Sequence, residues 1–85
     1  MQLYSTCNEK GYQLKVQVPT TIFDPMTAVI RAYRGKKCVG AIYFDLKKMP
    51  YWYDSARTIM IGKHDEKTLE QKTEELLRRL PNREE

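Results

Sequence analysis

The chain has 85 residues, of which 41% are hydrophobic and 31% are charged, and its formal net charge is +4. This size and composition predict that residues 1–85 form a single small domain with a thin core rather than a disordered chain. No apolar run approaches the roughly 20 residues that a membrane-spanning helix requires, and the first residues lack the features of a secretory signal, so we expect a cytoplasmic protein without a membrane partner.

The clearest predicted strand covers residues 12–18, along which apolar and polar residues alternate strictly. A period of two is typical of an antiparallel strand with one buried and one wet face. The apolar face comprises Tyr12, Leu14, Val16 and Val18, and the polar face comprises Gln13, Lys15 and Gln17. Pro19 ends this strand. A shorter candidate strand over residues 2–7 comes before it, and a turn at 8–11 joins the two.

Residues 26–34 fit either a strand or a short helix. In the helical alternative Asp24 is the N-cap, Pro25 occupies the first turn and Gly35 follows the last residue. In the other alternative residues 27–34 form a strand that turns at Gly35-Lys36 into a second strand, as in a two-residue hairpin. We favour the hairpin because the apolar strand that follows needs partners on both sides.

The continuous apolar run 38–44 predicts the central strand of the sheet, with apolar residues on both faces. A loop containing Pro50 is expected over residues 47–53. A last strand is expected over residues 55–62. These elements complete an antiparallel sheet of four to five strands.

The C-terminal segment predicts one amphipathic helix over residues 65–80. Asp65 is a suitable N-cap, and Pro81 ends the helix. One stripe at helical spacing is apolar apart from a threonine, and it comprises Leu69, Thr73, Leu76, Leu77 and Leu80. This helix is expected to pack on one face of the sheet, so the predicted fold class is α+β.

The residues that could carry chemistry do not form a recognisable catalytic set. His64 is the single histidine, and the nearby Ser55 has no Gly-x-Ser-x-Gly elbow around it. Cys7 and Cys38 are far apart in the sequence and offer no zinc-binding spacing. We therefore expect no enzymatic activity, no metal and no cofactor.

The segment 47–53 is the most informative for function because it places two lysines beside three aromatic residues. The aromatic side chains could stack on unpaired bases while lysines hold phosphates, they could anchor a protein interface, or Trp52 could fold back over the core. A basic turn at 34–37 adds further cations. The candidate nucleic-acid-binding residues are Lys36, Lys37, Lys47, Lys48, Tyr51, Trp52, Tyr53 and Arg57.

In element order alone, a meander followed by one helix resembles the positive-cofactor and Whirly types of single-stranded DNA-binding protein. That resemblance implies dimers that bind with the sheet surface, and it identifies no site residue here. The predicted central strand is apolar on both faces, and a single helix covers only part of the sheet. The uncovered face is therefore expected to need a partner, which predicts a homodimer. The expected function is a non-catalytic binding module for single-stranded nucleic acid, and the alternative is a small protein-interaction or regulatory subunit.

Overall fold

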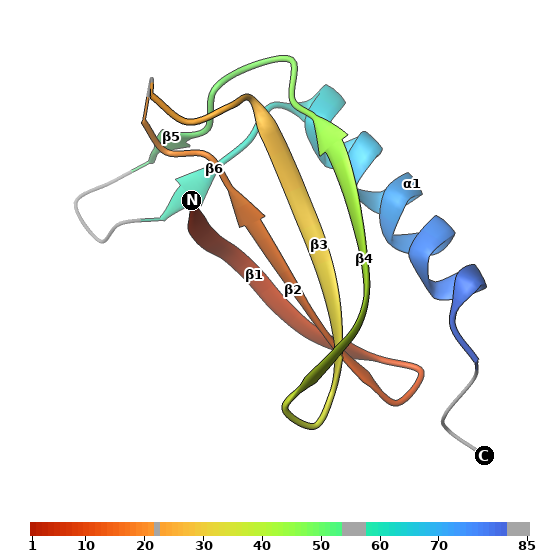
Figure 1. Cartoon of the computed structure of the whole chain (residues 1–85). Coiled ribbons are helices and arrows are strands. Elements are labelled where there is room, and N and C mark those ends of the chain that lie inside the picture. The colour runs from red at the N-terminus through yellow and green to blue at the C-terminus, as the bar shows by residue number, and fades with distance from the viewer. Residues whose placement is uncertain (22, 54–57, 82–85) are drawn as a thin grey trace.

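The computed structural model describes residues 1–21, 23–53 and 58–81. Four antiparallel strands form a sheet in the order β1 (Gln2–Glu9), β2 (Tyr12–Val18), β3 (Thr27–Arg34) and β4 (Lys37–Asp45). A two-stranded ribbon, β5 (Tyr51–Trp52) and β6 (Ile59–Met60), leads into the helix α1 (Lys63–Arg79). The helix lies against one side of the sheet (Figure 1), which confirms the α+β fold class.

Tight turns join the strands of the two hairpins. Lys10 and Gly11 have φ values of 53° and 84° between β1 and β2, as in the type I′ turns that match the twist of paired strands. Between β3 and β4, Gly35 has a φ of 64°, which a residue without Cβ adopts at little cost. The hairpin prediction for residues 26–34 is therefore confirmed, and the helical alternative is wrong.

Asp24, the predicted N-cap of a helix, instead stabilises the loop between β2 and β3. The Asp24 carboxylate accepts hydrogen bonds from the backbone N–H groups of Thr20 (3.1 Å) and Thr21 (3.4 Å), and it lies 3.7 Å from the Met1 ammonium. These donors hold the pKa of Asp24 below its ordinary value, with the Thr20 bond as the largest stabilising contribution. Residues 27–34 form a strand rather than a helix because pairing with β2 and β4 outweighs the local preference for a helix.

The predicted central position of residues 38–44 is wrong, because β4 is an edge strand that pairs only with β3 within the described residues. Its apolar character has another cause, since α1 packs directly against it. Gly40 makes this approach possible: a Cβ there would lie 3.2 Å from Leu80 Cδ2. The pairing register also shifts between Ala32 and Tyr33, so β4 carries a bulge at this level.

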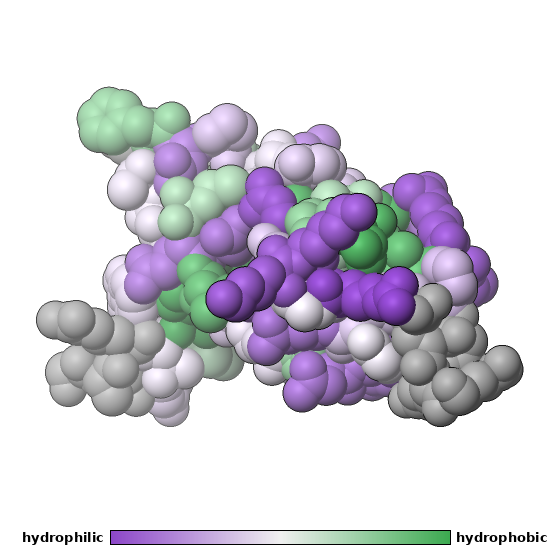
Figure 2. All heavy atoms as spheres, turned by 60° about the horizontal axis from the view of Figure 1, so that its bottom comes forward, coloured by the Kyte–Doolittle hydropathy of each residue, from purple (hydrophilic) through white to green (hydrophobic). Residues whose placement is uncertain are grey.

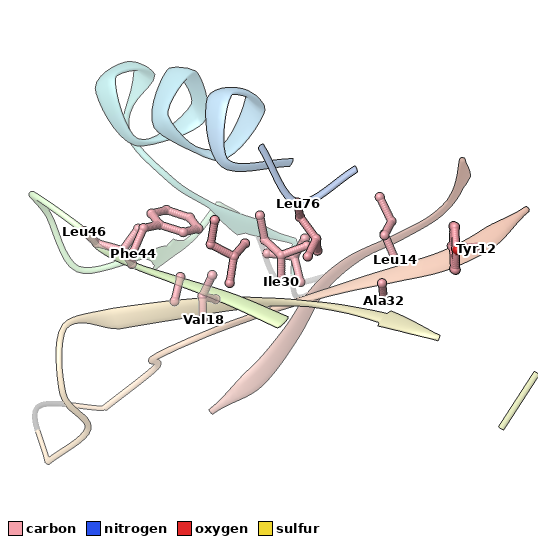
Figure 3. Close-up of a cluster of buried hydrophobic side chains, with 11 residues drawn as sticks. Tyr12, Leu14, Val18, Ile30, Ala32, Phe44, Leu46 and Leu76 are labelled. Atoms are coloured by element: carbon pink, nitrogen blue, oxygen red, sulfur yellow. The ribbon is translucent and has the colours of Figure 1, made fainter. Parts of the chain in front are cut away.

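The hydrophobic core lies between α1 and the face of the sheet that the alternating residues of β2 line (Figure 3). Leu14, Ile30 and Leu76 are each at most 2% exposed and come from three different elements. Phe44 and Leu46 extend the core toward the end of β4. The predicted inward face of β2 is confirmed, with all four of its apolar residues buried.

The helix begins and ends slightly earlier than predicted, at Lys63 and Arg79. Gly62 occupies the N-cap position, so the prediction that Asp65 caps the helix is wrong. At the other end the Tyr12 hydroxyl donates a 2.6 Å hydrogen bond to the Pro81 carbonyl oxygen and ties the residues that follow α1 to β2. No helix among the described residues is long and apolar enough to cross a membrane.

The last predicted strand is much shorter than expected. Of residues 55–62 only Ile59–Met60 form a strand, and residues 55–57 lie outside the described residues. Their partner, Tyr51–Trp52, falls within the segment predicted as a loop. The described residues thus form a four-stranded sheet, at the lower end of the predicted four to five strands, and a separate two-stranded ribbon.

Substitution of Leu76 tests the packing of the helix on the sheet. Leu76 is 2% exposed in the core, so Leu76→Ala should lower the free energy of unfolding by about 3 kcal/mol, as in other buried Leu→Ala changes. Urea denaturation followed by circular dichroism measures the loss. The same change at the half-buried Leu69 should cost no more than about half as much; equal losses would contradict this packing.

The Asp24 contacts predict a pH-dependent contribution to stability. Because the folded-state pKa of Asp24 is depressed, its contribution is present above the ordinary carboxyl pKa and disappears as the pH falls through the folded-state value. Asp24→Asn should therefore lower the thermal midpoint at neutral pH, and the difference from the parent should shrink below about pH 4. A difference that is constant from neutral pH to pH 2.5 would show that the ionised carboxylate contributes nothing.

Candidate nucleic-acid interface

The aromatic residues of the predicted loop are exposed at the end of the sheet where β2 and β4 end. Tyr51, Trp52 and Tyr53 are 55%, 45% and 69% exposed. Within the described residues, the short β5–β6 pairing and a bond from Tyr53 N–H to the Thr58 carbonyl oxygen (2.8 Å) hold their backbone. Trp52 therefore does not close over the core, and all three rings are available to a partner.

The two lysines of this loop are held by a buried carboxylate. Asp65, 1% exposed, accepts hydrogen bonds from the backbone N–H groups of Lys47 (2.9 Å) and Lys48 (3.2 Å). Asp65 lies within α1 and does not cap it, because its carboxylate binds backbone N–H groups of the segment that follows β4. The lysine side chains themselves remain exposed.

The predicted binding residues do not form one site. Lys36 and Lys37 lie at the β3–β4 turn, whereas Lys47, Lys48 and the aromatic residues lie beyond the opposite end of β4. The nine residues of β4 separate the two groups by roughly 26 Å at the usual rise of a strand. Arg57 lies outside the described residues.

The sheet face that points away from α1 carries a second set of basic and aromatic side chains. The strand register defines its three cross-strand rows. The middle row is Thr6, Lys15, Arg31 and Ala41, and it lies between the rows Leu3, Gln17, Val29, Tyr43 and Asn8, Gln13, Tyr33, Cys38. We call these three rows the open face.

The cations of the open face are already oriented by neutral neighbours. Lys15 Nζ lies 5.0 Å from the centroid of the Tyr33 ring, and an Arg31 Nη1 group donates a hydrogen bond to Gln17 Oε1. Lys15 and Arg31 make no ion pair among the described residues, so neither charge is neutralised. Tyr43 is 59% exposed on the neighbouring strand. The arrangement presents two positive charges between two aromatic rings.

The open face is polar enough to be stable in water, which corrects the expectation of an uncovered apolar face. Its most apolar member, Val29, is 0% exposed although no helix lies over it. Gln17 and Tyr43 are its cross-strand neighbours, and side chains this close on one face cover each other. The argument for a homodimer through this face therefore loses its basis.

Sequence reasoning found one half of the open face and missed the other. The alternation in residues 12–18 had identified the polar side of β2, including Lys15. Arg31 and Tyr33 join it only through the hairpin register, which the strand-or-helix ambiguity at 26–34 concealed. The hairpin alternative, paired with β2, was the signal that could have located the face.

The two hairpin turns extend the positive charge beyond the open face. Lys10, Arg34, Lys36 and Lys37 lie at these turns and are exposed, and Glu9 is the acidic residue beside them. Figure 2 looks toward this end of the molecule and shows hydrophilic side chains gathered over it. By contrast α1 carries acidic and basic residues in equal number. The positive field therefore belongs to the sheet.

A groove of about 640 Å³ runs on the other face, between α1 and β1. Leu14 and Val16 form part of its floor, Leu69 and Leu77 line its helical wall, and Cys7 lies on its strand wall. Burial and the neighbouring Glu9 carboxylate raise the pKa of the Cys7 thiol, so the thiol stays protonated at neutral pH. The groove has no catalytic grouping among its lining residues.

No metal-binding group of three or more histidine, cysteine or carboxylate residues occurs within residues 1–21, 23–53 and 58–81. Searches with the whole chain found no matching protein-family model, no matching curated protein and no matching solved structure.

The Asp65 contacts predict that this carboxylate fixes the loop after β4. Asp65→Asn removes the charge and turns one acceptor into a donor facing a backbone N–H group, which should cost about 1–3 kcal/mol. Hydrogen exchange of the Lys47 and Lys48 amides should accelerate by more than the global loss explains. Glu70→Gln, the same change at an exposed site of α1, serves as the control, and equal effects of the two changes would exclude this role.

Proposed function

We propose that this chain is a non-catalytic module that binds single-stranded nucleic acid on the open face of its sheet. The observation that carries the proposal is the Lys15–Arg31 row between Tyr33 and Tyr43. Unpaired bases have exposed π-faces that stack on aromatic side chains, and their phosphates attract cations. Both kinds of group occur together on this face.

The spacing of the two tyrosines suits a strand of stacked bases. Tyr43 lies opposite Val29, and Tyr33 follows Val29 by four residues on β3, so the rings are roughly 13 Å apart along the strand direction. Arg31 lies between them on the same face. In known RNA-binding modules, aromatic residues on a four-stranded sheet stack two or three bases.

The distribution of charge supports a phosphate partner. The exposed cations at the hairpin turns continue the open face toward Lys36 and Lys37, two of the residues predicted from the sequence. A strand that leaves the face at Tyr33 would therefore pass directly over positive charge. Lys47 and Lys48 would hold phosphates only from a longer strand that spans β4.

A second candidate function is protein docking at the end of the sheet that carries Tyr51, Trp52 and Tyr53. Phe23, 91% exposed, lies at the same end, in the loop that joins β2 to β3. Exposed aromatic side chains are frequent anchors of protein interfaces. Either function is compatible with a homodimer, since two-fold dimers are the commonest soluble oligomers.

Binding of a fluorescently labelled single-stranded oligonucleotide, measured by anisotropy at two salt concentrations, tests the proposal. Two cations on the face predict a slope of log affinity against log salt of about −1.4 or steeper. Tyr43→Ala should weaken binding about fivefold or more, as loss of one stacked base does. Lys15→Gln should weaken binding and reduce the salt slope by roughly 0.7.

Matched changes away from the open face provide the controls. Tyr53→Ala removes a similarly exposed ring (69% against 59% for Tyr43) that is not part of the open face, and Lys67→Gln removes an exposed cation from α1. Both should leave affinity within about twofold of the parent. Absence of binding at low salt would refute the proposal. A larger effect of Tyr53→Ala than of Tyr43→Ala would move the interface to the predicted loop.

A further inference from the structure

Strand β1 is an edge strand whose outer side pairs with no other strand among the described residues. It pairs with β2 alone, through all but one of its eight residues. The outward N–H and C=O groups of such a strand are a template for another strand. Soluble proteins therefore protect long edges with lysine, proline, pronounced bulges or a covering element.

The outer edge of β1 has little of this protection. Seven of its eight residues are uncharged, and none is lysine or proline. Its single irregularity is a register shift between Leu3 and Ser5, close to one end. The other edge strand differs, since β4 has a charged residue at each end and α1 packed against it.

We propose that β1 pairs with β1 of a second copy of this chain, antiparallel and across a two-fold axis. The charge pattern of the strand favours this partner and this direction. An uncharged strand meets its own copy without repulsion, and the one charge, Glu9, lies at the end of the strand. Antiparallel pairing places the two Glu9 carboxylates at opposite ends of the interface, whereas parallel pairing would put them side by side.

The exposed residues of β1 are consistent with this interface. Leu3 is 49% exposed on the open face at the edge of the sheet, and a neighbouring strand would cover part of it. The two four-stranded sheets would become one continuous sheet of eight strands. The two open faces would join at β1, so that the Lys15–Arg31 row of each copy continues into the other.

The oligomeric state, measured by light scattering and sedimentation over a range of concentrations, tests the interface. The parent chain should form a dimer. Thr6→Lys places like charges near each other across the two-fold axis and should raise the dimer dissociation constant about tenfold or more. Gln13→Lys adds the same charge on the same face of the inner strand β2, and it should leave the dimer unchanged.

Thiol cross-linking locates the contact independently. Cys7 and Cys38 are both exposed and free, and they lie on the opposite edge strands β1 and β4. With a short bismaleimide, the Cys38→Ser variant should cross-link into dimers and Cys7→Ser should not. Three results would each overturn the proposal. They are a monomer at every concentration, equal effects of Thr6→Lys and Gln13→Lys, and cross-linking through Cys38 alone. A Thr6→Lys monomer that still binds oligonucleotide would leave the proposed function standing.

Discussion

One helix can cover one face of a four-stranded sheet, and the other face must then be stable in water. The chain meets this constraint through the alternation in β2, which sends Leu14 and Val16 toward α1 and Lys15 toward solvent. The same constraint makes the open face a durable surface rather than half of a core. No helix covers this surface among the described residues, so the binding proposed for it would require neither unfolding nor displacement of another element.

Much of the fold could be predicted because the signals were local. The period of two in residues 12–18 and the leucine stripe of α1 each specify an element without knowledge of its neighbours. The position of β4 could not be predicted in this way. Its apolar residues are equally compatible with a central strand between two others and with an edge strand under a helix, and only the strand order and the packing of α1 on β4 distinguish the two.

The candidate site was harder to predict than the fold because a binding face combines residues from several strands. Proximity in sequence grouped Lys47 and Lys48 with Tyr51, and the structure keeps them together at one end. Proximity in sequence could not reveal that Lys36 lies at the far end of β4, or that Arg31 and Lys15 are cross-strand neighbours. Asp65 illustrates the same limit: its position suits a helix cap, but its carboxylate binds a loop that lies 17 residues away at its nearest bond.

The distribution of charge and the unpaired edge of β1 together support one proposal, a positively charged binding face on a sheet that a second copy extends. The positive field belongs to the sheet, the helix is neutral, and β1 offers a way to double the sheet without covering the open face. The most direct test is the chemical-shift change of backbone amides when an unlabelled single-stranded oligonucleotide is added to the isotope-labelled chain. The account predicts changes centred on Lys15, Arg31, Tyr33 and Tyr43, with α1 unaffected. Changes confined to α1 or to Tyr51–Tyr53, or none at all at low salt, would contradict it.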